Sequence, residues 1–331
     1  FIGKKFDFSS INCYKDFSKK VPVFSYEEFS DKIELARKGE NNIFWSSKIK
    51  WFAKSSGTTN AKSKFIPVSD ESLQDCHYAA GKDLLCMYFN NNPNSQLFTG
   101  KSLRLGGSKS PYEKNGTFYG DLSAILIDNM PFWAEFSSTP SNRISLMEDW
   151  DKKIDKIIIE SLNENVTSLA GVPSWMLVLL NRILEKSEEK YISDLWPNLE
   201  VYFHGGVSFK PYLNQYMDII NKESMQFYEI YNASEGFFAI QYENNSNELL
   251  LMLDYGIFYE FIPMKVYGTK NEKIIPLYEV EKDVNYAILI TTNAGLWRYK
   301  IGDTVKFTST SPYKIIITGR TKHYINVFGE E

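Results

Sequence analysis

The chain has 331 residues, a length that predicts one large α/β unit with sub-lobes or two closely packed domains. Hydrophobic residues make up 43% of it, and its 23 Phe and 21 Tyr favour an ordered protein with aromatic-lined cavities over a disordered one. The formal net charge is −4 with Lys and Arg scattered among acids, which argues against nucleic acid as a partner, and no apolar run approaches the roughly 20 residues that would predict a membrane partner.

Cysteine and histidine are too few and too dispersed for a disulfide framework or a zinc site. Cys13, Cys76 and Cys86 form no CxxC pair. Because the chain begins at Phe1 without a signal-like region and ends after a strand-like run, we expect a piece of a longer protein. A cytoplasmic location follows only by default.

Taken in chain order, the sequence alternates strand, glycine-bearing turn and helix, which predicts a mixed α/β fold with ligands at the strand ends. The first such junction is a strand at 49–53, followed by a polar loop at 54–64. A helix is expected after Ser69, which is a plausible N-cap.

Two further junctions follow the same pattern. A strand at 199–204 ends in Gly205-Gly206 before a helix that begins at Pro211. This helix is predicted to carry Leu213, Met217 and Ile220 on one face. The third junction is a strand at 227–231 that breaks at residues 232–236.

The remaining elements form the scaffold. Amphipathic helices are predicted at 150–162 and 174–185, with a short strand at 167–170 between them, and Trp175 is assigned to the core rather than to a substrate pocket. After residue 248 the chain becomes β-rich. The expected β elements are a hairpin around 254–256 and strands at 286–292, 304–308 and 313–317.

The loop from Ser55 to Lys64 is dense in hydroxyl groups, contains Gly57 and ends in lysines. Such a segment can wrap a polyphosphate with hydroxyl and backbone N–H donors, although a flexible surface loop would have the same composition. It is not a Walker A loop, because Ala61 replaces the second glycine and the lysine is displaced.

The sequence SSGTT followed closely by Lys resembles the phosphate loop of the adenylate-forming superfamily, which includes acyl-CoA ligases and luciferases. Three later segments resemble further motifs of that superfamily in the same order. They are YNASE at 231–235, YKIGD at 299–303 and TGR at 318–320.

Four longer segments resemble one particular family within this superfamily. SSGTTNAKSKFIPVS, FHGGVSFKPY, YNASEGFFAIQ and GLWRYKIGDTVKF resemble the bacterial branch of the auxin-responsive GH-three family of acyl-acid amido synthetases. The resemblance implies an acyl-CoA ligase-like large N-terminal domain, with α/β lobes over 1–248 and a β-rich sub-lobe over 249–318. Residues 319–331 would be a hinge toward a small C-terminal domain. Lys300, where the family motif often has Arg, is a departure.

The resemblance also implies roles for individual residues. Thr58, Lys64 and Glu235 would be catalytic, and Glu235 would also reach the Mg²⁺ on ATP. Asp303 would accept hydrogen bonds from the ribose hydroxyls. The other nucleotide contacts would be made by the phosphate-loop, adenine-side and C-terminal residues Ser55, Ser56, Gly57, Thr59, Gly205, Gly206, Tyr231, Asn232, Ala233, Ser234 and Arg320.

The function implied is ATP-dependent adenylation of a carboxylic acid, followed by attack of an amine or amino acid on the acyl-adenylate. One alternative is an acyl-CoA ligase, which uses a thiol acceptor after the same first step. Others are a nucleotide-binding module without turnover and a non-enzymatic interaction protein. The sequence names neither the acid nor the amine, because acyl pockets are shaped by scattered side chains.

Overall fold

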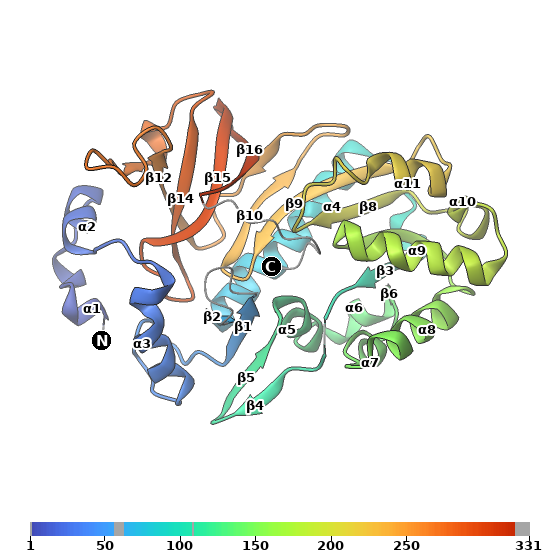
Figure 1. The fold of residues 1–331 in the computed structure, drawn as a ribbon, viewed down its shortest axis with the longest axis horizontal. Helices are drawn as coiled ribbons and strands as arrows, with labels where there is room; N and C mark the ends of the chain where they lie inside the picture. Colours follow the sequence, from blue (N-terminus) through green and yellow to red (C-terminus); the bar gives the residue numbers. More distant parts are fainter. Residues whose placement is uncertain (1, 56–62, 108, 322–331) are drawn as a thin grey trace.

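The computed structural model describes residues 2–55, 63–107 and 109–321, and within these ranges two sheets are surrounded by helices (Figure 1). One end of the larger sheet consists of parallel strands. These are β3 (Lys101–Leu105), β6 (Ser138–Thr139), β7 (Val166–Gly171), β8 (Val201–Gly205) and β9 (Gln226–Ala233). The predicted strands at 167–170, 199–204 and 227–231 are therefore confirmed.

The other end of the larger sheet is antiparallel. Its strands are β10 (Gly236–Gln241), β11 (Leu249–Leu251), β12 (Ile257–Pro263), β13 (Ile275–Pro276), β14 (Asn285–Thr292), β15 (Tyr299–Thr310) and β16 (Tyr313–Arg320). The full order among the described residues is β13-β12-β14-β15-β16-β11-β10-β9-β8-β7-β3-β6. One continuous sheet thus joins the α/β part of the chain to the β-rich part, and the predicted mixed α/β fold class is confirmed.

The predicted hairpin around residues 254–256 is wrong. Its flanking strands β11 and β12 do not pair with each other: β11 pairs with β10 and β16, whereas β12 pairs with β13 and β14. The segment is a connection between distant positions of the sheet, because each flanking strand finds its partners elsewhere in the chain.

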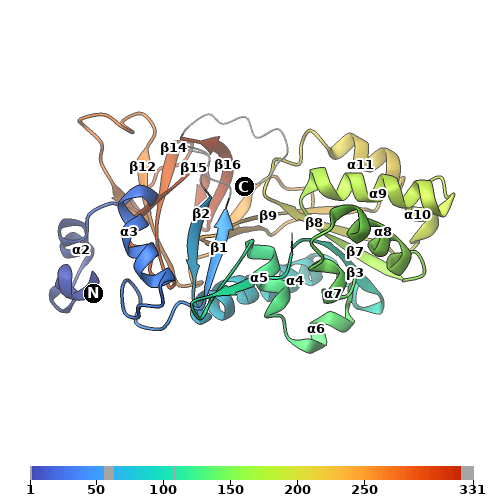
Figure 2. The same ribbon diagram turned by 60° about the horizontal axis from the view of Figure 1, so that its bottom comes forward.

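Helices cover both faces of the parallel strands, as Figure 2 shows for α9 and α11 on one side of β8 and β9 and α4 on the other. The first face carries α8 (Trp150–Ser161), α9 (Pro173–Ser187), α10 (Ile192–Leu195) and α11 (Leu213–Ile220). The second carries the π-helical segment η2 (Ser72–Tyr78), α4 (Ala79–Asn91) and α5 (Leu122–Asp128). Coverage of both faces explains why consecutive residues of β7 and β8 are buried.

The helices predicted at 150–162 and 174–185 are confirmed as α8 and α9. Asp149 caps α8 by accepting the backbone N–H of Lys152 at 3.1 Å. The prediction for α11 is partly wrong: the helix begins at Leu213, which is exposed, as is Met217. Its buried side is formed by Tyr216 and Ile220, because the larger tyrosine ring fills the space under the helix.

The smaller sheet has the order β2-β1-β5-β4 in the described residues. It consists of β1 (Trp51–Ser55), β2 (Lys64–Val68), β4 (Tyr112–Lys114) and β5 (Thr117–Gly120). Strand β2 begins where the polar loop was expected to end, and Ser55 pairs with Lys64 across the β1–β2 ladder. The predicted cap is confirmed, since the Ser72 backbone N–H donates to Ser69 Oγ at 3.0 Å.

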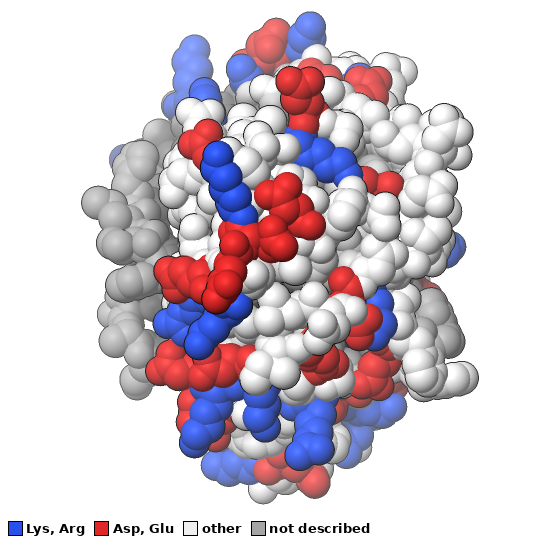
Figure 3. Space-filling view, turned by 90° about the vertical axis from the view of Figure 1, so that its right-hand side faces the viewer, with Lys and Arg blue, Asp and Glu red and all other residues white. Residues whose placement is uncertain are grey.

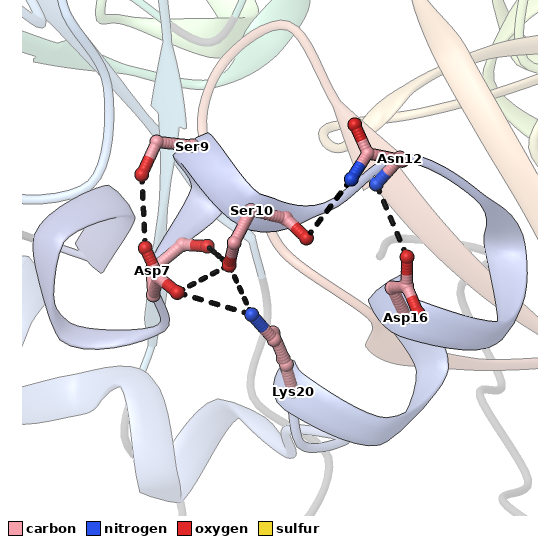
Figure 4. Close-up of polar contacts among 6 residues, drawn as sticks. All are labelled: Asp7, Ser9, Ser10, Asn12, Asp16 and Lys20. Carbon is pink, nitrogen blue, oxygen red and sulfur yellow. Dashed lines mark hydrogen bonds and ion pairs between the residues drawn. The ribbon is translucent and has the colours of Figure 1, made fainter.

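The N-terminal segment packs against β15 through Phe24, which exchanges backbone hydrogen bonds with Arg298 and Lys300. Figure 4 shows how its first turns are held: Lys20 Nζ lies 3.1 Å from Asp7 Oδ2, and Ser9 Oγ donates to Asp7 Oδ1 at 2.9 Å. The helices of this segment are α1 (Ile2–Lys5), η1 (Phe8–Ser10), α2 (Tyr14–Lys20) and α3 (Tyr26–Arg37). Short helices elsewhere are η3 (Leu97–Thr99), α6 (Phe132–Phe136), α7 (Asn142–Ser145) and η4 (Leu277–Glu279).

Charged side chains of both signs lie intermingled on the face seen in Figure 3. Over the described residues, none of the helices has the length and apolar character needed to cross a bilayer.

Candidate active site

A cavity of about 2480 Å³ is lined by the carboxyl-terminal ends of β3, β7, β8 and β9, by the smaller sheet and by η2, α4 and α5. It brings together residues from all three junctions predicted from the sequence. The lining includes Ser55 and Ser63 beside the phosphate-loop segment, the glycines after β8, and the turn after β9. Side chains from separate parts of the sequence thus meet at the ends of parallel strands, where ligands bind in open α/β sheets.

Gly205 and Gly206 keep the wall beside β8 flat. A Cβ atom on Gly205 would lie 2.6 Å from the backbone oxygen of Ile230, so no larger residue fits there without a shift of β9. Gly206 has φ of +83°, a conformation that favours glycine. Both line the cavity, so a planar ligand group could approach the backbone closely at this position.

Tyr231, Asp303 and Arg320 form a hydrogen-bonded cluster that links β9 to the paired strands β15 and β16. The Tyr231 hydroxyl donates to Asp303 Oδ2 at 2.8 Å, and Arg320 Nε donates to Asp303 Oδ1 at 3.0 Å. Burial raises the pKa of Asp303, while the Arg320 charge and these hydrogen bonds oppose that rise. The carboxylate is therefore held in a fixed orientation, and each oxygen retains a lone pair for a further donor.

Glu235 lies in the turn between β9 and β10, and it forms no salt bridge with a described residue. Loss of solvation, with a smaller contribution from the nearby Asp303 carboxylate, raises the pKa of its carboxyl group to about 7. The charges of Lys64 and Arg320 act in the opposite direction. The charge of Lys64 also lowers the pKa of Asp303, which places the β2 lysine near both carboxylates.

The residues that the family resemblance implies to be functional fall into three groups according to their place in the structure. Ser56, Gly57, Thr58 and Thr59 lie outside the described residues. The turn residues Asn232, Ala233 and Ser234 line the cavity, together with Ser55, Gly205 and Gly206. The third group is absent from the cavity lining and contains Lys64, Tyr231, Glu235, Asp303 and Arg320. Tyr231 and Glu235 adjoin lining residues in the sequence, and Asp303 contacts Tyr231.

Two motif residues have surroundings that the sequence did not indicate. The Tyr231 ring is only 5% exposed and packs 4.9 Å from Phe238, so stacking of a base on it stays a prediction. Lys300 does not point to Asp303; its Nζ lies 2.8 Å from Glu272 Oε1. Alternation along β15 accounts for this difference, because Lys300 and Asp303 are on opposite faces of the strand.

Other cavity residues gave no recognisable signal in the sequence. Arg104 on β3 and Lys153 on α8 both line the cavity, although no motif includes them. Trp175 was assigned to the core, but it also lines the cavity and packs edge-on against Trp150 at 4.8 Å. Its helical position alone could not distinguish these two environments.

The donor set around Glu235 fits a magnesium ion carried by a polyphosphate. Mg²⁺ is commonly held by one or two carboxylates together with substrate phosphates, rather than by an all-protein cage. Glu235 supplies one such carboxylate, and loss of solvation, which raises the pKa of this group, disfavours its charged form. A bound cation would stabilise that charged form.

The fold is that of adenylate-forming ligases. A solved structure described as AtGH3.15 acyl acid amido synthetase in complex with 2,4-DB matches 95% of this chain and 64% of its own, with a TM-score of 0.81 and 17% sequence identity. A 2-hydroxyisobutyryl-CoA ligase matches 98% of this chain and 65% of its own, with a TM-score of 0.60 and 12% identity.

Family models identify the chain more narrowly. Residues 2–225 match the GH3 family N-terminal domain, and residues 250–320 match the GH3 family central domain. The chain therefore belongs to the GH3 family, which confirms the resemblance to the GH-three family; a place in its bacterial branch stays a prediction.

Similar proteins of known name include two ligases from Arabidopsis thaliana. An indole-3-acetic acid-amido synthetase, GH3.4, is 24% identical over 92% of this chain and 61% of its own length. A 4-substituted benzoates-glutamate ligase, GH3.12, is 24% identical over 88% of this chain and 60% of its own. A jasmonoyl-L-amino acid synthetase from Nicotiana attenuata is 23% identical over 88% of this chain and 60% of its own length. The chain thus spans about three fifths of the length of these relatives.

Proposed function

We propose that the protein is an ATP-dependent ligase that adenylates a carboxylic acid and transfers the acyl group to the amine of an amino acid. The observation that carries this proposal is the convergence of Lys64, Tyr231, Glu235, Asp303 and Arg320, from four separate strands and a turn, beside a cavity large enough for a nucleotide and an acid. Similar proteins that are named as acid-amino acid ligases support it.

In the first step, the acid's carboxylate attacks the α-phosphate of ATP, and pyrophosphate leaves. Phosphoryl transfer of this kind depends mainly on positioning and on neutralising charge. Asp303, fixed by Tyr231 and Arg320, accepts hydrogen bonds from the ribose hydroxyls. The flat wall at Gly205 and Gly206 receives the adenine.

Lys64 supplies positive charge on the phosphate side, beside Ser55 at the start of the loop. The hydroxyl-rich segment 56–59 adds phosphate donors in this proposal. Glu235 would hold Mg²⁺, which when bound would neutralise phosphate charge. In the second step the amine attacks the acyl carbonyl, an amide forms and AMP leaves. ATP use favours a cytoplasmic location.

Product analysis tests the proposal. The purified protein would be incubated with ATP, Mg²⁺ and a panel of aryl and aliphatic acids, together with an amino acid mixture or with coenzyme A. We expect AMP and an N-acyl amino acid, identified by mass spectrometry. Formation of an acyl-CoA in place of an amide would make the protein a CoA ligase, and ATP binding without AMP formation would make it a nucleotide-binding module.

A further inference from the structure

The described part of the cavity beside β3 includes cations that the proposed reaction does not use. Arg104 lies on β3 and Lys153 on α8, and both line the cavity. Strand β3 is the second strand from β8 in the sheet. At the usual strand spacing it lies about 10 Å from Gly205 and Gly206 at the end of β8. These cations therefore lie about two strands away from the glycines that the proposed function assigns to adenine.

The Arg104 guanidinium has only weak partners. Its Nη1 contacts Met130 Sδ at 2.7 Å, and its Nη2 lies 3.4 Å from Asn142 Oδ1. Its Nε is buried without a hydrogen-bond partner, and no carboxylate of a described residue lies within 4.0 Å of the side chain. Burial lowers the pKa of Arg104 to about 10, with the more distant Glu135 charge opposing that change.

Lys153 brings a second buried charge to the carboxyl end of the same strand. The residue is 1% exposed, and its Nζ donates to the backbone oxygen of Gly106 at 3.2 Å and to that of Gly107. Two of its three donors are thus used. Gly106 follows Arg104 by two residues, so both cations flank one end of β3.

The carboxylates whose charges act on these cations, Glu135 and Asp121, accept hydrogen bonds from other groups. Glu135 Oε1 accepts the Asn142 backbone N–H at 3.0 Å, and Asp121 Oδ1 caps α5 by accepting the Ala124 N–H at 2.8 Å. Glu148 pairs with Lys109 at 2.7 Å. Arg104 is partly buried, and a guanidinium in such a place that serves only the fold is normally paired with a carboxylate, because an unpaired charge with little solvation is costly. An anion supplied by a ligand would complete the arrangement.

We infer that the acid substrate carries a second carboxylate, remote from the reacting one, which Arg104 binds with help from Lys153. This inference rests on the proposed function and names its substrate class. Arg is suited to the role because its planar donors match a carboxylate in a bidentate contact. Trp150 and Trp175, which pack together at 4.8 Å beside Lys153, provide an apolar wall for the body of such an acid.

Matched acids test the inference. Adipate, suberate and terephthalate would each be compared with hexanoate, octanoate and 4-methylbenzoate, by calorimetric binding to the purified protein and by acid-dependent exchange of labelled pyrophosphate into ATP. We expect at least one dicarboxylate to be preferred over its partner. In Arg104→Met the ratio of kcat/KM for the pair should fall by about 10- to 100-fold, the effect of losing a charged hydrogen bond.

Two further variants separate specificity from folding. Arg104→Lys keeps the charge and should retain part of the preference. Lys109→Met removes a cation from the same cavity wall that is already paired with Glu148, so the ratio should not change. Melting temperatures of all variants would show that each is folded.

The possible failures are distinguishable. Two results would overturn the inference and leave adenylation intact. One is faster exchange with the monocarboxylates than with every dicarboxylate. The other is an equal loss of kcat/KM for both members of each pair in Arg104→Met. Absence of exchange, together with calorimetric binding that keeps the dicarboxylate preference and loses it in Arg104→Met, would support the inference and remove the proposed function. If no dicarboxylate binds in calorimetry and none supports pyrophosphate exchange, the inference is overturned.

Discussion

The buried ion pair between Arg298 and Glu260 makes a sharp prediction about stability. Arg298 Nε and Nη2 each lie 2.8 Å from a Glu260 oxygen, and the two residues are 4% and 1% exposed. Arg298 Nη1 also donates to the backbone oxygens of Ser18 and Val21, so this side chain ties the N-terminal helices to the sheet. Tyr14 donates to Glu260 Oε1 at 2.9 Å.

Arg298→Met would leave the Glu260 carboxylate buried, with the Tyr14 hydroxyl as its one remaining side-chain partner among the described residues. We expect this substitution to lower the free energy of unfolding by about 3 to 5 kcal/mol, the usual cost of removing one member of a buried pair. Adding Glu260→Leu removes the uncompensated charge, so the double variant should regain about 1 to 3 kcal/mol despite its extra substitution.

Urea unfolding followed by circular dichroism and tryptophan fluorescence measures both effects. Lys273→Met, which breaks an exposed pair with Glu279 at 3.4 Å, is the control and should unfold at the same urea concentration as the parent protein. If the double variant is less stable than Arg298→Met alone, an unpaired Glu260 charge is not the source of the loss, and the reasoning is refuted.

Three other predictions concern the site and its supporting strands. Asp303→Asn should weaken ATP binding by about 10-fold or more through loss of a charged acceptor, measured by calorimetry; an unchanged affinity would exclude contact with the ribose. Gly205→Ala should lower both the melting temperature and the ATP-induced rise in it, because its Cβ would meet the Ile230 oxygen at 2.6 Å; a normal response to ATP would mean that the glycine wall does not approach the nucleotide. Burial lowers the pKa of His204 to about 3, so the unfolded chain takes up a proton below about pH 6.5 while the native state does not, and stability falls as pH falls. His204→Phe should therefore lose about 1 to 2 kcal/mol less than the parent between pH 7 and pH 5 in urea unfolding, and an equal loss would assign the acid sensitivity to other groups.

Local patterns predicted the parallel strands and their flanking helices well. The strand within residues 199–206 is a compact, mainly apolar run ended by glycines, and α8 and α9 have clear apolar faces. Such elements are determined mainly by residues close in sequence. The motif residues could then be placed at strand ends, where the structure brings Tyr231, Asp303 and Arg320 into contact.

Features that depend on distant partners could not be predicted in this way. Strand β2 contains Pro67, which discourages a strand assignment, but β2 lies at the edge of its sheet, where proline is tolerated. The residues at 254–256 look like a hairpin turn, yet pairing over long sequence distances places β11 and β12 apart. Arg104 alternates with apolar residues as in any strand, and only the assembled fold shows that it lines the cavity.

Exchange of labelled pyrophosphate into ATP, measured in the parent protein and in Lys64→Ala, tests most directly whether the cluster of Lys64, Glu235 and Asp303 is an adenylation site. We predict exchange that requires a carboxylic acid and that falls by about 100- to 1000-fold in Lys64→Ala, the effect of losing one preorganised donor. Exchange at the parental rate in Lys64→Ala, or no exchange with any acid despite ATP binding, would contradict the account.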